Sequence, residues 1–329
     1  MRRSVGLVLV AVGAFFLTLA PLVRYYVADR VAVAPLNRYE TTRLEASNAA
    51  YFDGATLKLR NGVSLVAINT IRGDVRANGG DDRIAVWDST TNIYDSAAPG
   101  RPVQLQGHRI AFDRRTARLV NCCGANADGD NTVRMSGYGL LFPRTGVHRR
   151  DYPFFDMATK RPAPMRFNGV EEVRGLTAYR FTQHVPLTRT AALDTKVPAR
   201  LLGLAGADRE VDRYTEAYNT VWVDPRTGIP VKHRENVRAT VQTPDGKGRM
   251  VVTQADFVTV PRDQRALVDT ADATAIRVAL VRAYVPAGAV VLGLVLLLVG
   301  GYFGLVRGEP SAPTASRRPD GRFGAAARA

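Results

Sequence analysis

The chain has 329 residues, and 45 Lys and Arg against 30 Asp and Glu give it a formal net charge of +15 at pH 7. The basic residues are dispersed, and no zinc finger, recognition helix or RNP-like motif accompanies them, so we expect no nucleic-acid partner. Long apolar runs near both ends point instead to a membrane-anchored protein.

The first apolar run predicts a transmembrane helix over residues 5–24, behind a short segment 1–4. Val5 to Val23 contains Thr18 as its one hydrogen-bonding side chain, with arginines on both flanks. The alternative is a cleaved signal peptide, which has an apolar core of about 7–15 residues followed closely by a small-x-small site. The nearest such site, Ala32-Val-Ala34, lies far downstream, so we expect an uncleaved anchor.

The second apolar run predicts a transmembrane helix over residues 285–306. Val285 to Val306 is 22 residues without a charge. At about 1.5 Å per residue, a helix of this length crosses the roughly 30 Å hydrocarbon core of a bilayer. A buried core helix is the alternative, but such helices rarely stay apolar on every face over this length.

Flanking charges predict the orientation. Arg2 and Arg3 precede the first span, and the tail 307–329 has a net charge of +3. By the positive-inside rule both ends are cytoplasmic, the tail being basic and disordered, and residues 25–284 lie outside the cytoplasmic (inner) membrane. Tyr25, Tyr26 and Tyr284 would then fall at the outer interface, where aromatic belts occur.

The segment between the spans is long enough for one large domain or two small ones. The N-terminal arginines and the tail account for +5 of the net charge, which leaves +10 for this segment. Such a charge favours attraction to anionic lipids or acidic envelope polymers. The alternative is a set of scattered charges that serve solubility only.

Glycines in the two spans share a heptad-like spacing. Gly6 and Gly13 lie seven positions apart, as do Gly293 and Gly300, and Gly300-x-x-x-Gly304 is a small-xxx-small pattern. Small residues on one face allow two helices to approach closely, so we predict that the spans pack together. The alternative is that these glycines reflect only the general frequency of glycine in membrane helices.

The middle segment predicts an antiparallel sheet, either an open barrel or a half-barrel. Short stretches that alternate in polarity recur between turn signals, as in antiparallel β proteins. Asn61-Gly62 predicts a tight hairpin turn, since this pair suits a type I′ geometry. A second hairpin is expected over 231–260, closing at Pro244-Asp-Gly246, and 262–284 is expected to be helical. The fold class is therefore an α+β membrane protein with a β-rich ectodomain between two helical anchors.

The only cysteines are adjacent, Cys122 and Cys123, and Gly124 follows them. Outside the cytoplasm thiols usually oxidise. The options are a vicinal disulfide, intermolecular bridges or free thiols, and we favour the vicinal disulfide in a turn. A metal site is not expected, because no further Cys or nearby His completes a ligand set.

Catalytic signatures do not emerge. His108, His148, His184 and His233 are scattered, and no metalloprotease, nucleophile-elbow, phosphate-binding or dinucleotide-binding motif is present. The segment Asp128-Gly-Asp130-Asn is only superficially like a calcium loop and reads as a solvated turn. We therefore predict neither enzyme activity nor a cofactor.

A set of short motifs is shared with a known family. They are Tyr51-Phe-Asp53 with a following hairpin, Phe112-Asp-Arg-x-Thr-Ala, Cys122-Cys-Gly, Phe142-Pro, Tyr152-Pro-Phe-Phe-Asp, Gly175-Leu-x-x-Tyr-x-Phe and Val221-Trp-Val-Asp-Pro-x-Thr-Gly, placed between two anchors. In this order they resemble the actinobacterial family called porin PorA, over most of residues 1–306. The resemblance implies an envelope location and the two-span topology, and it carries over no catalytic residue.

The sequence is compatible with three functions. A membrane-spanning barrel needs an apolar outer face, whereas Arg234-Glu-Asn-Val-Arg238 places charge on both faces of a strand. The turn Trp222–Pro230 is similar to one in half-barrel lipoprotein carriers, and the two-anchor layout looks like that of scavenger-receptor lipid proteins. We therefore favour a non-catalytic domain that binds or handles lipid or envelope polymer. A porin-like channel is the alternative, and a membrane-anchored hydrolase is a distant third.

Overall fold

The computed structural model describes residues 2–144 and 146–305, so the predicted tail 307–329 lies outside the described residues. The chain divides into two compact units. Residues 24–284 form a β-rich domain, and the segments before residue 24 and after residue 284 form a helical unit. Each unit is described by itself below.

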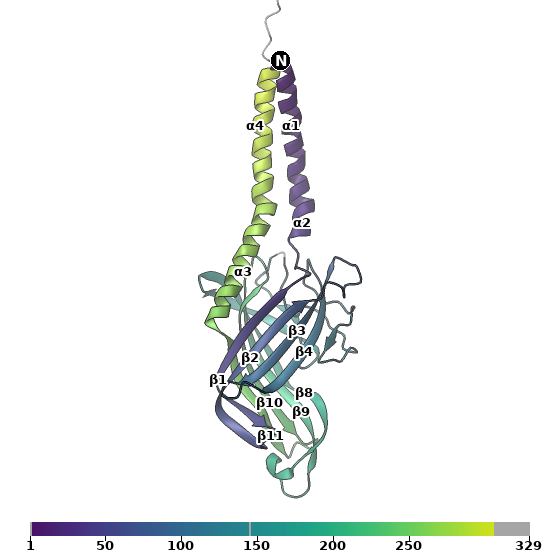
Figure 1. Cartoon of the computed structure of the whole chain (residues 1–329), viewed down its shortest axis with the longest axis vertical. Coiled ribbons are helices and arrows are strands. Elements are labelled where there is room, and N and C mark those ends of the chain that lie inside the picture. The colour runs from purple at the N-terminus through teal and green to yellow at the C-terminus, as the bar shows by residue number, and fades with distance from the viewer. Residues whose placement is uncertain (1, 145, 306–329) are drawn as a thin grey trace, which may run out of the picture. The chain divides into compact units, whose positions relative to one another are not determined.

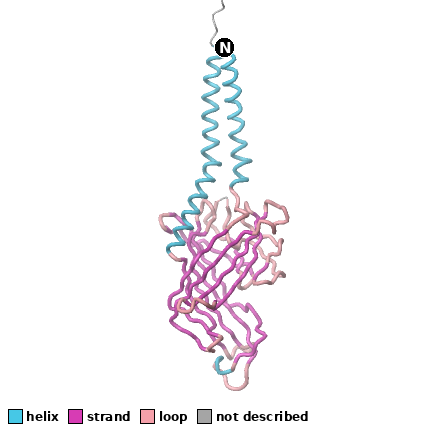
Figure 2. Tube along the Cα trace, viewed as in Figure 1, coloured by secondary structure: helices cyan, strands magenta, loops and turns pink. Residues whose placement is uncertain are grey.

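Within the described residues, the domain contains one antiparallel sheet of eleven strands that does not close. Its order is β5-β4-β3-β2-β1-β11-β10-β9-β8-β7-β6, and the two edge strands, β5 and β6, do not pair with each other. Figure 1 shows β1 to β4 as one wall of a half-barrel and β8 to β11 as the other, and Figure 2 shows the continuous strand surface. The strands are β1 (Tyr39–Asp53), β2 (Lys58–Gly73), β3 (Ile84–Asp95), β4 (Pro102–Asp113), β5 (Asn126–Ala127), β6 (Tyr152–Asp156), β7 (Arg161–Val173), β8 (Leu176–Val197), β9 (Arg209–Val223), β10 (Pro230–Gln242) and β11 (Arg249–Thr259).

The predicted fold class, an open or half-barrel antiparallel domain between two long apolar helices, is confirmed. Polarity alternates along the strands because successive side chains point to opposite faces of a sheet. On β1, Leu44 and Ala46 are buried on the concave face, whereas Arg43 and Glu45 are exposed on the convex face. The convex face is therefore polar along much of the sheet.

The predicted hairpin turn at Asn61-Gly62 is wrong. β2 runs straight through these residues, and the turn lies at 54–57, where Asp53 pairs with Lys58. The Asp53 carboxylate fixes this turn by accepting hydrogen bonds from the Ala55 amide at 3.0 Å and the Thr56 hydroxyl at 2.8 Å. The positive φ of Gly62 is used instead where the register between β1 and β2 shifts, as in a β-bulge.

The second predicted hairpin is confirmed as β10 and β11, which pair from Arg234–Val258 to Gln242–Arg249. Thr243 organises its turn. The hydroxyl of Thr243 donates to Asp245 Oδ1 at 2.6 Å and accepts from the Gly248 amide at 2.9 Å.

The turn between β9 and β10 is anchored by Asp224, which is completely buried. Its carboxylate accepts hydrogen bonds from the Thr227 hydroxyl at 2.7 Å and the Arg226 amide at 3.1 Å. Gly228 has φ +70°, and a Cβ there would lie 2.5 Å from the carbonyl oxygen of Pro143. The β9–β10 turn therefore packs closely against the loop that precedes β6.

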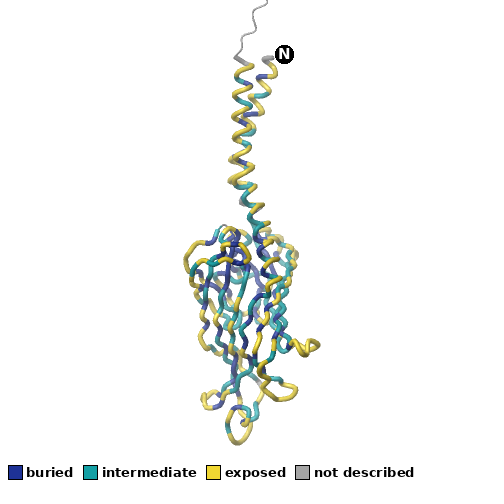
Figure 3. Tube along the Cα trace, turned by 90° about the vertical axis from the view of Figure 1, so that its left-hand side faces the viewer, coloured by how far each residue is buried: buried dark blue, intermediate teal, exposed yellow. Residues whose placement is uncertain are grey.

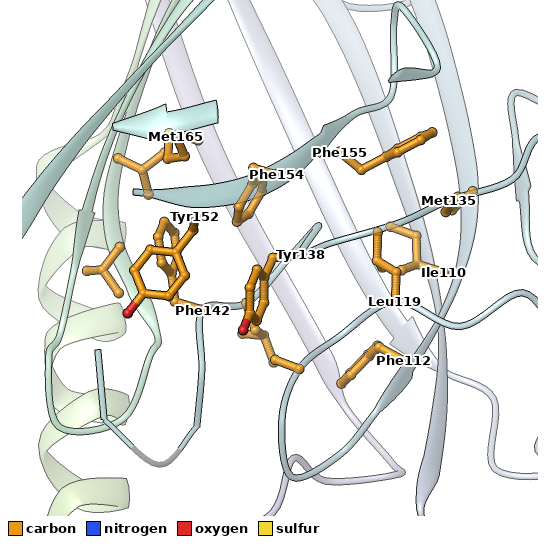
Figure 4. Packing of buried hydrophobic residues seen from close by; sticks show 14 of the residues in the cluster. Ile110, Phe112, Leu119, Met135, Tyr138, Phe142, Tyr152, Phe154, Phe155 and Met165 are labelled. Carbon is orange, nitrogen blue, oxygen red and sulfur yellow. The ribbon is translucent and has the colours of Figure 1, made fainter. Parts of the chain in front are cut away.

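An aromatic cluster fills the half-barrel at the end where β1 begins. Phe142 is its centre, with ring centroids 4.7 Å from Phe181, 5.2 Å from Phe154 and 5.5 Å from Tyr152. Figure 4 shows Phe142, Tyr152 and Phe154 near one another, with Tyr138 beside them. The loop between β4 and β6 supplies much of this cluster, so it covers the interior at one end of the open sheet. We call the rings of Trp87, Phe112, Tyr138, Phe142, Tyr152, Phe154 and Phe181 the aromatic cluster.

Helix α3 (Pro261–Ala279) follows β11 and packs on the convex face. Val268 and Ala271 are buried against Trp222 and Val231. Proline in the first turn suits a helix start, because its missing N–H has no intrahelical partner there. The 3₁₀ turn η2 (Ala199–Leu202) lies between β8 and β9, and α2 (Ala28–Val31) precedes β1. The predicted helix over 262–284 is confirmed as α3 and the π-helical turn η3 (Leu280–Tyr284).

The helical unit consists of α1 (Arg2–Leu22) and α4 (Val285–Leu305), and the π-helical turn η1 (Val23–Val27) follows α1. Both helices are exposed along most of their length (Figure 3). Within the described residues, the stretches Ser4–Val27 and Pro261–Phe303 each contain a window that is long and apolar enough to cross a membrane.

Predicted packing glycines lie where α1 and α4 meet. A Cβ on Gly13 would come within 2.8 Å of the Gly293 carbonyl oxygen, and a Cβ on Gly300 within 2.8 Å of the Gly6 carbonyl oxygen. The backbones therefore approach as closely as glycine allows. Gly304 lies near the end of α4. Packing of the spans through these glycines in a bilayer stays a prediction, with this geometry in its favour.

Replacing Gly293 or Gly300 with Ala should destabilise the helix pair by about 1–3 kcal/mol, because the added methyl group meets backbone atoms that cannot rotate away. Gly301 is the matched control, since a Cβ there meets nothing within 4 Å. The measurement is unfolding of the full chain by SDS in mixed micelles, followed by far-UV circular dichroism. Equal effects of Gly293→Ala and Gly301→Ala would contradict the predicted packing.

Candidate functional site: the half-barrel cavity

The concave face of the sheet encloses a cavity of about 620 Å³. This volume lies within the range typical of small-molecule sites, about 300–1,000 Å³. Side chains from β1 to β4 and from β8 to β11 line it, so residues far apart in sequence share one space. Its apolar wall includes Leu44, Ile71, Ile93, Val185, Val237, Phe154, Phe155 and Met165.

A seam remains where the sheet fails to close, between β5 and β6. The ammonium group of Lys160, in the turn after β6, lies 2.8 Å from the Asp130 carboxylate, in the turn after β5. Hydrogen bonds from Lys160, from the Thr132 hydroxyl and from the Thr132 backbone amide lower the pKa of Asp130 to about 2. At neutral pH this ion pair therefore connects the turns beside the two edge strands, β5 and β6, which share no backbone hydrogen bonds in the sheet.

Beside the seam, His108 projects from β4 into the cavity lining. Its Nδ1 lies 3.7 Å from Asp128 Oδ1, which is too long for a hydrogen bond, and this buried nitrogen has no hydrogen-bond partner among the described residues. Burial lowers the pKa of His108, and the charges of Asp128 and Asp156 oppose that shift only in part. His108 is therefore a neutral, polar wall residue at physiological pH.

Two titratable residues project from β10 toward the same space. Glu235 and His233 both border the cavity, two positions apart on one face of the strand. Burial raises the pKa of Glu235 to about 7, and the charge of Asp156 adds to the rise. Burial lowers the pKa of His233 to about 4. Both side chains keep some free surface only because the cavity itself adjoins them.

Polar side chains of β8 and β9 complete the lining. Asn219 donates to Gln183 Oε1 at 3.1 Å, while the buried Oδ1 of Asn219 has no partner. Arg213 reaches Gln104 Oε1 across the interior at 3.4 Å, and burial lowers its pKa. The lining is thus apolar over much of its area, with a few charged and hydrogen-bonding groups. That composition suits an amphiphilic ligand better than a purely apolar one.

The residues singled out in the sequence lie elsewhere. The structure joins Cys122 and Cys123 in a disulfide, packed with Val86 and Ala125 away from the cavity. Cys123 and Gly124 both have positive φ, as the predicted turn requires, while the redox state in the envelope stays a prediction. The packing glycines belong to the helical unit. Among the described residues, no group of three or more His, Cys, Asp or Glu side chains is arranged to hold a metal ion.

The sequence patterns do not identify Glu235 and Arg213 as cavity residues, and they give His108 only as one of four scattered histidines. One signal was available for Glu235. Glu235 lies on the same face of the strand as Val237 and Ala239, because residues two positions apart point to the same side. A charged residue therefore stands at an inward position of the strand.

Fold and site together define an antiparallel half-barrel with an internal amphiphilic cavity, in a chain that also has two long apolar helices. The chain belongs to the porin PorA family, whose model matches residues 5–302. This confirms the resemblance found in the motifs. It is a membrane protein of the cell envelope, in a porin family that is not catalytic, in agreement with the prediction that the chain is not an enzyme.

Two relatives named porin PorA are similar to the chain. The protein from Corynebacterium amycolatum is 22% identical over 318 residues, which cover 78% of this chain and 82% of the relative. The protein from Corynebacterium resistens is 24% identical over 217 residues, which cover 48% of this chain and 52% of the relative. The second alignment thus spans about half the length of that relative.

The pKa of Glu235 predicts a pH dependence of stability. Its folded pKa of about 7 lies above the ordinary 4.5, so the stability it contributes is complete below pH 4.5 and is lost as the pH rises through 7. His233 acts in the opposite direction, between its ordinary 6.5 and about 4, so the window above pH 6.5 isolates Glu235.

We expect Glu235→Gln to flatten the loss of stability above pH 6.5 and to raise the melting temperature there by a few degrees, since each kcal/mol corresponds to about 2–4 °C. Tryptophan fluorescence of the full chain reports this melting, because Trp87 and Trp222 both lie in the β-rich domain. Glu210→Gln, an exposed carboxyl on β9, is the control. Identical pH profiles for wild type and Glu235→Gln would refute the assignment.

Proposed function

We propose that the half-barrel domain binds a lipid-like amphiphile in its cavity and that the chain holds this domain at the membrane. The observation that carries the proposal is the cavity of about 620 Å³ with an apolar wall and a few buried polar groups. Burial of an acyl chain against the apolar wall would supply the binding free energy, about 25 cal/mol per Å² of apolar surface. An envelope polymer fits less well, because the aromatic cluster covers the interior at one end.

The proposal includes the membrane topology. Residues 5–24 and 285–306 cross the cytoplasmic membrane, residues 25–284 face outward, and residues 1–4 and 307–329 stay in the cytoplasm. Apolar length and flanking arginines support this arrangement. The net charge of the outer segment favours anionic lipid or acidic polymer near the domain.

The second candidate function is a pore. The family match and the names of both relatives favour it. The convex face of the half-barrel argues against a pore made by this sheet alone. Arg234 and Asp256 form an exposed ion pair there, and Arg238 is exposed on the same face, whereas a lipid-facing barrel wall is apolar. Conduction would therefore depend on assembly of several copies.

Val237→Trp should reduce lipid uptake at least about tenfold, because the larger ring occupies the cavity that Val237 lines. Arg238→Trp, the next residue, points outward and is the matched control. The full chain is placed in peptidiscs without added lipid, and uptake of a phospholipid with an acyl-chain fluorophore is followed by its gain in intensity. Uptake that is absent in wild type, or equal in wild type and Val237→Trp, would contradict lipid binding in the cavity.

The two candidates also differ in planar bilayers. If the cavity is a lipid site, the full chain should produce no discrete conductance steps. Steps that persist in wild type and change in size with Glu235→Gln would place the ion path along the cavity and would favour the pore.

A further inference from the structure

Three polar side chains form one row across adjacent strands of the concave face. In the antiparallel register Gln183 of β8 pairs with Asn219 of β9, and Asn219 pairs with Glu235 of β10. All three residues line the cavity. Residues directly opposite each other in such a ladder have Cβ atoms about 4.5–5.5 Å apart, so the three polar groups lie side by side. We call them the polar row.

Hydrogen bonds to the backbone fix the orientation of the first two side chains. The carbonyl oxygens of Phe154 and Ala163 can only accept, and Gln183 Nε2 donates to them at 3.4 Å and 3.1 Å. Gln183 Oε1 is therefore left to accept from Asn219 Nδ2, at 3.1 Å. Asn219 Oδ1 is the acceptor at the end of this chain. It is buried and has no hydrogen-bond partner among the described residues.

Glu235, the last member of the polar row, is also without a partner. Within residues 2–144 and 146–305, no hydrogen bond or ion pair joins its carboxyl group to the rest of the protein. Its neighbour on the other side, Phe257 of β11, is apolar. Buried acceptors without donors are costly. Two such acceptors side by side in a cavity therefore indicate that a ligand supplies the donors.

The next inward row along the same three strands is apolar. Val185 pairs with Ala217, and Ala217 pairs with Val237. These three residues, which we call the apolar row, also line the cavity. A ligand that donates to the polar row would therefore place an apolar part against the apolar row. Because these surroundings exclude water, each hydrogen bond made there is stronger than the same bond in solvent.

We propose that Asn219 and Glu235 bind the primary ammonium group of an amphiphile, whose acyl chain lies against the apolar row. This inference rests on the proposed lipid-binding function and deepens it by naming the chemistry of the headgroup. A primary ammonium carries several N–H donors on one nitrogen, so the same group can donate to the amide oxygen and to the carboxylate. A hydroxyl group has one hydrogen to donate and would leave the carboxylate without a counter-charge.

The acidity of Glu235 suits a cationic donor. Burial raises the pKa of this carboxyl to about 7, so its charged and neutral forms have similar free energies near neutral pH. A bound ammonium favours the charged form. The other two members of the polar row are neutral amides, so the row carries a single negative charge for a single positive one.

The test uses a series of lipids that differ only in N–H donors. Phosphatidylethanolamine, its N-methyl and N,N-dimethyl derivatives and phosphatidylcholine, all with the same fluorescent acyl chain, are added to the full chain in lipid-free peptidiscs. The four lipids share one phosphate and one net charge, and each methyl group replaces one N–H donor. Wild type should bind phosphatidylethanolamine about tenfold or more tightly than phosphatidylcholine, with affinity falling along the series, because charge-assisted hydrogen bonds are lost.

Glu235→Gln should remove this preference. The new amide has no charge, and its own N–H groups can donate to Asn219 Oδ1 in place of the ligand. Glu45→Gln is the matched control, because Glu45 is exposed on the convex face and its replacement removes the same charge. The control should keep the full preference for phosphatidylethanolamine.

A structural role of Glu235 gives a different result. A carboxyl that only affects folding would change the melting temperature of the lipid-free protein and leave the ratio of the two affinities as it is in wild type. An unchanged ratio in Glu235→Gln would therefore overturn the inference. Equal affinities for all four lipids in wild type would overturn it without any variant.

The remaining outcomes separate this inference from the proposed function. Uptake of none of the lipids overturns both. Phosphatidylglycerol that binds as tightly as phosphatidylethanolamine, and depends on Glu235, would identify a hydroxyl donor and overturn the ammonium. Ethanolamine that displaces the labelled lipid as effectively as unlabelled phosphatidylethanolamine would identify a small amine as the ligand and overturn the amphiphile.

Discussion

The packing of Phe142 against Tyr152, Phe154 and Phe181 is the contact on which the β-rich domain depends. An antiparallel sheet that stays open leaves its concave face exposed unless another segment covers it. Here the loop between β4 and β6 carries aromatic side chains across the interior and fills one end. Gly228 fits the same loop closely against the β9–β10 turn, where any side chain would collide with the Phe142 and Pro143 carbonyls.

Filling one end leaves the rest of the interior as a cavity, and burial there changes the chemistry of its wall. Glu235, His233 and Arg213 would be ordinary charged side chains in water. Inside the half-barrel, desolvation disfavours the charged forms, so it raises the pKa of Glu235 and lowers the pKa of His233 and Arg213. The ion pair of Lys160 with Asp130 then bridges the seam where the sheet does not close. A set of polar side chains within an apolar wall results, and the proposed binding of an amphiphile depends on this combination.

The family name suggests a pore, whereas the geometry of the cavity favours ligand binding. Porin is the name that the family and both relatives carry, whereas an internal cavity under a charged convex face fits a lipid-binding domain on helical anchors. The two are compatible with one evolutionary family, because a fold carries many functions and the site decides among them.

Local patterns in the sequence were enough to determine several features. Two charge-free runs predicted helices, alternation predicted strands, and Pro244-Asp-Gly246 predicted the turn between β10 and β11. Asn61-Gly62 failed as a turn signal because the pairing of β1 with β2 uses the positive φ of Gly62 within a strand, and pairing is a long-range property. The motifs also identified the family, because they recur as short contiguous strings.

Only the tertiary structure decided where the cavity lies and which charges border it. Gln104 meets Arg213 from more than a hundred positions away, and Glu235 is enclosed by walls contributed from both halves of the domain. The burial and the pKa of each cavity residue depend on this convergence, because every neighbouring element excludes some water from the side chain and so disfavours its charged form. The sequence alone determined the two long apolar helices, the β-rich domain and the family, because those follow from local periodicity, composition and short motifs. Strand register and loop packing determined which side chains line the cavity, because no local sequence pattern predicts which distant side chains will face one another.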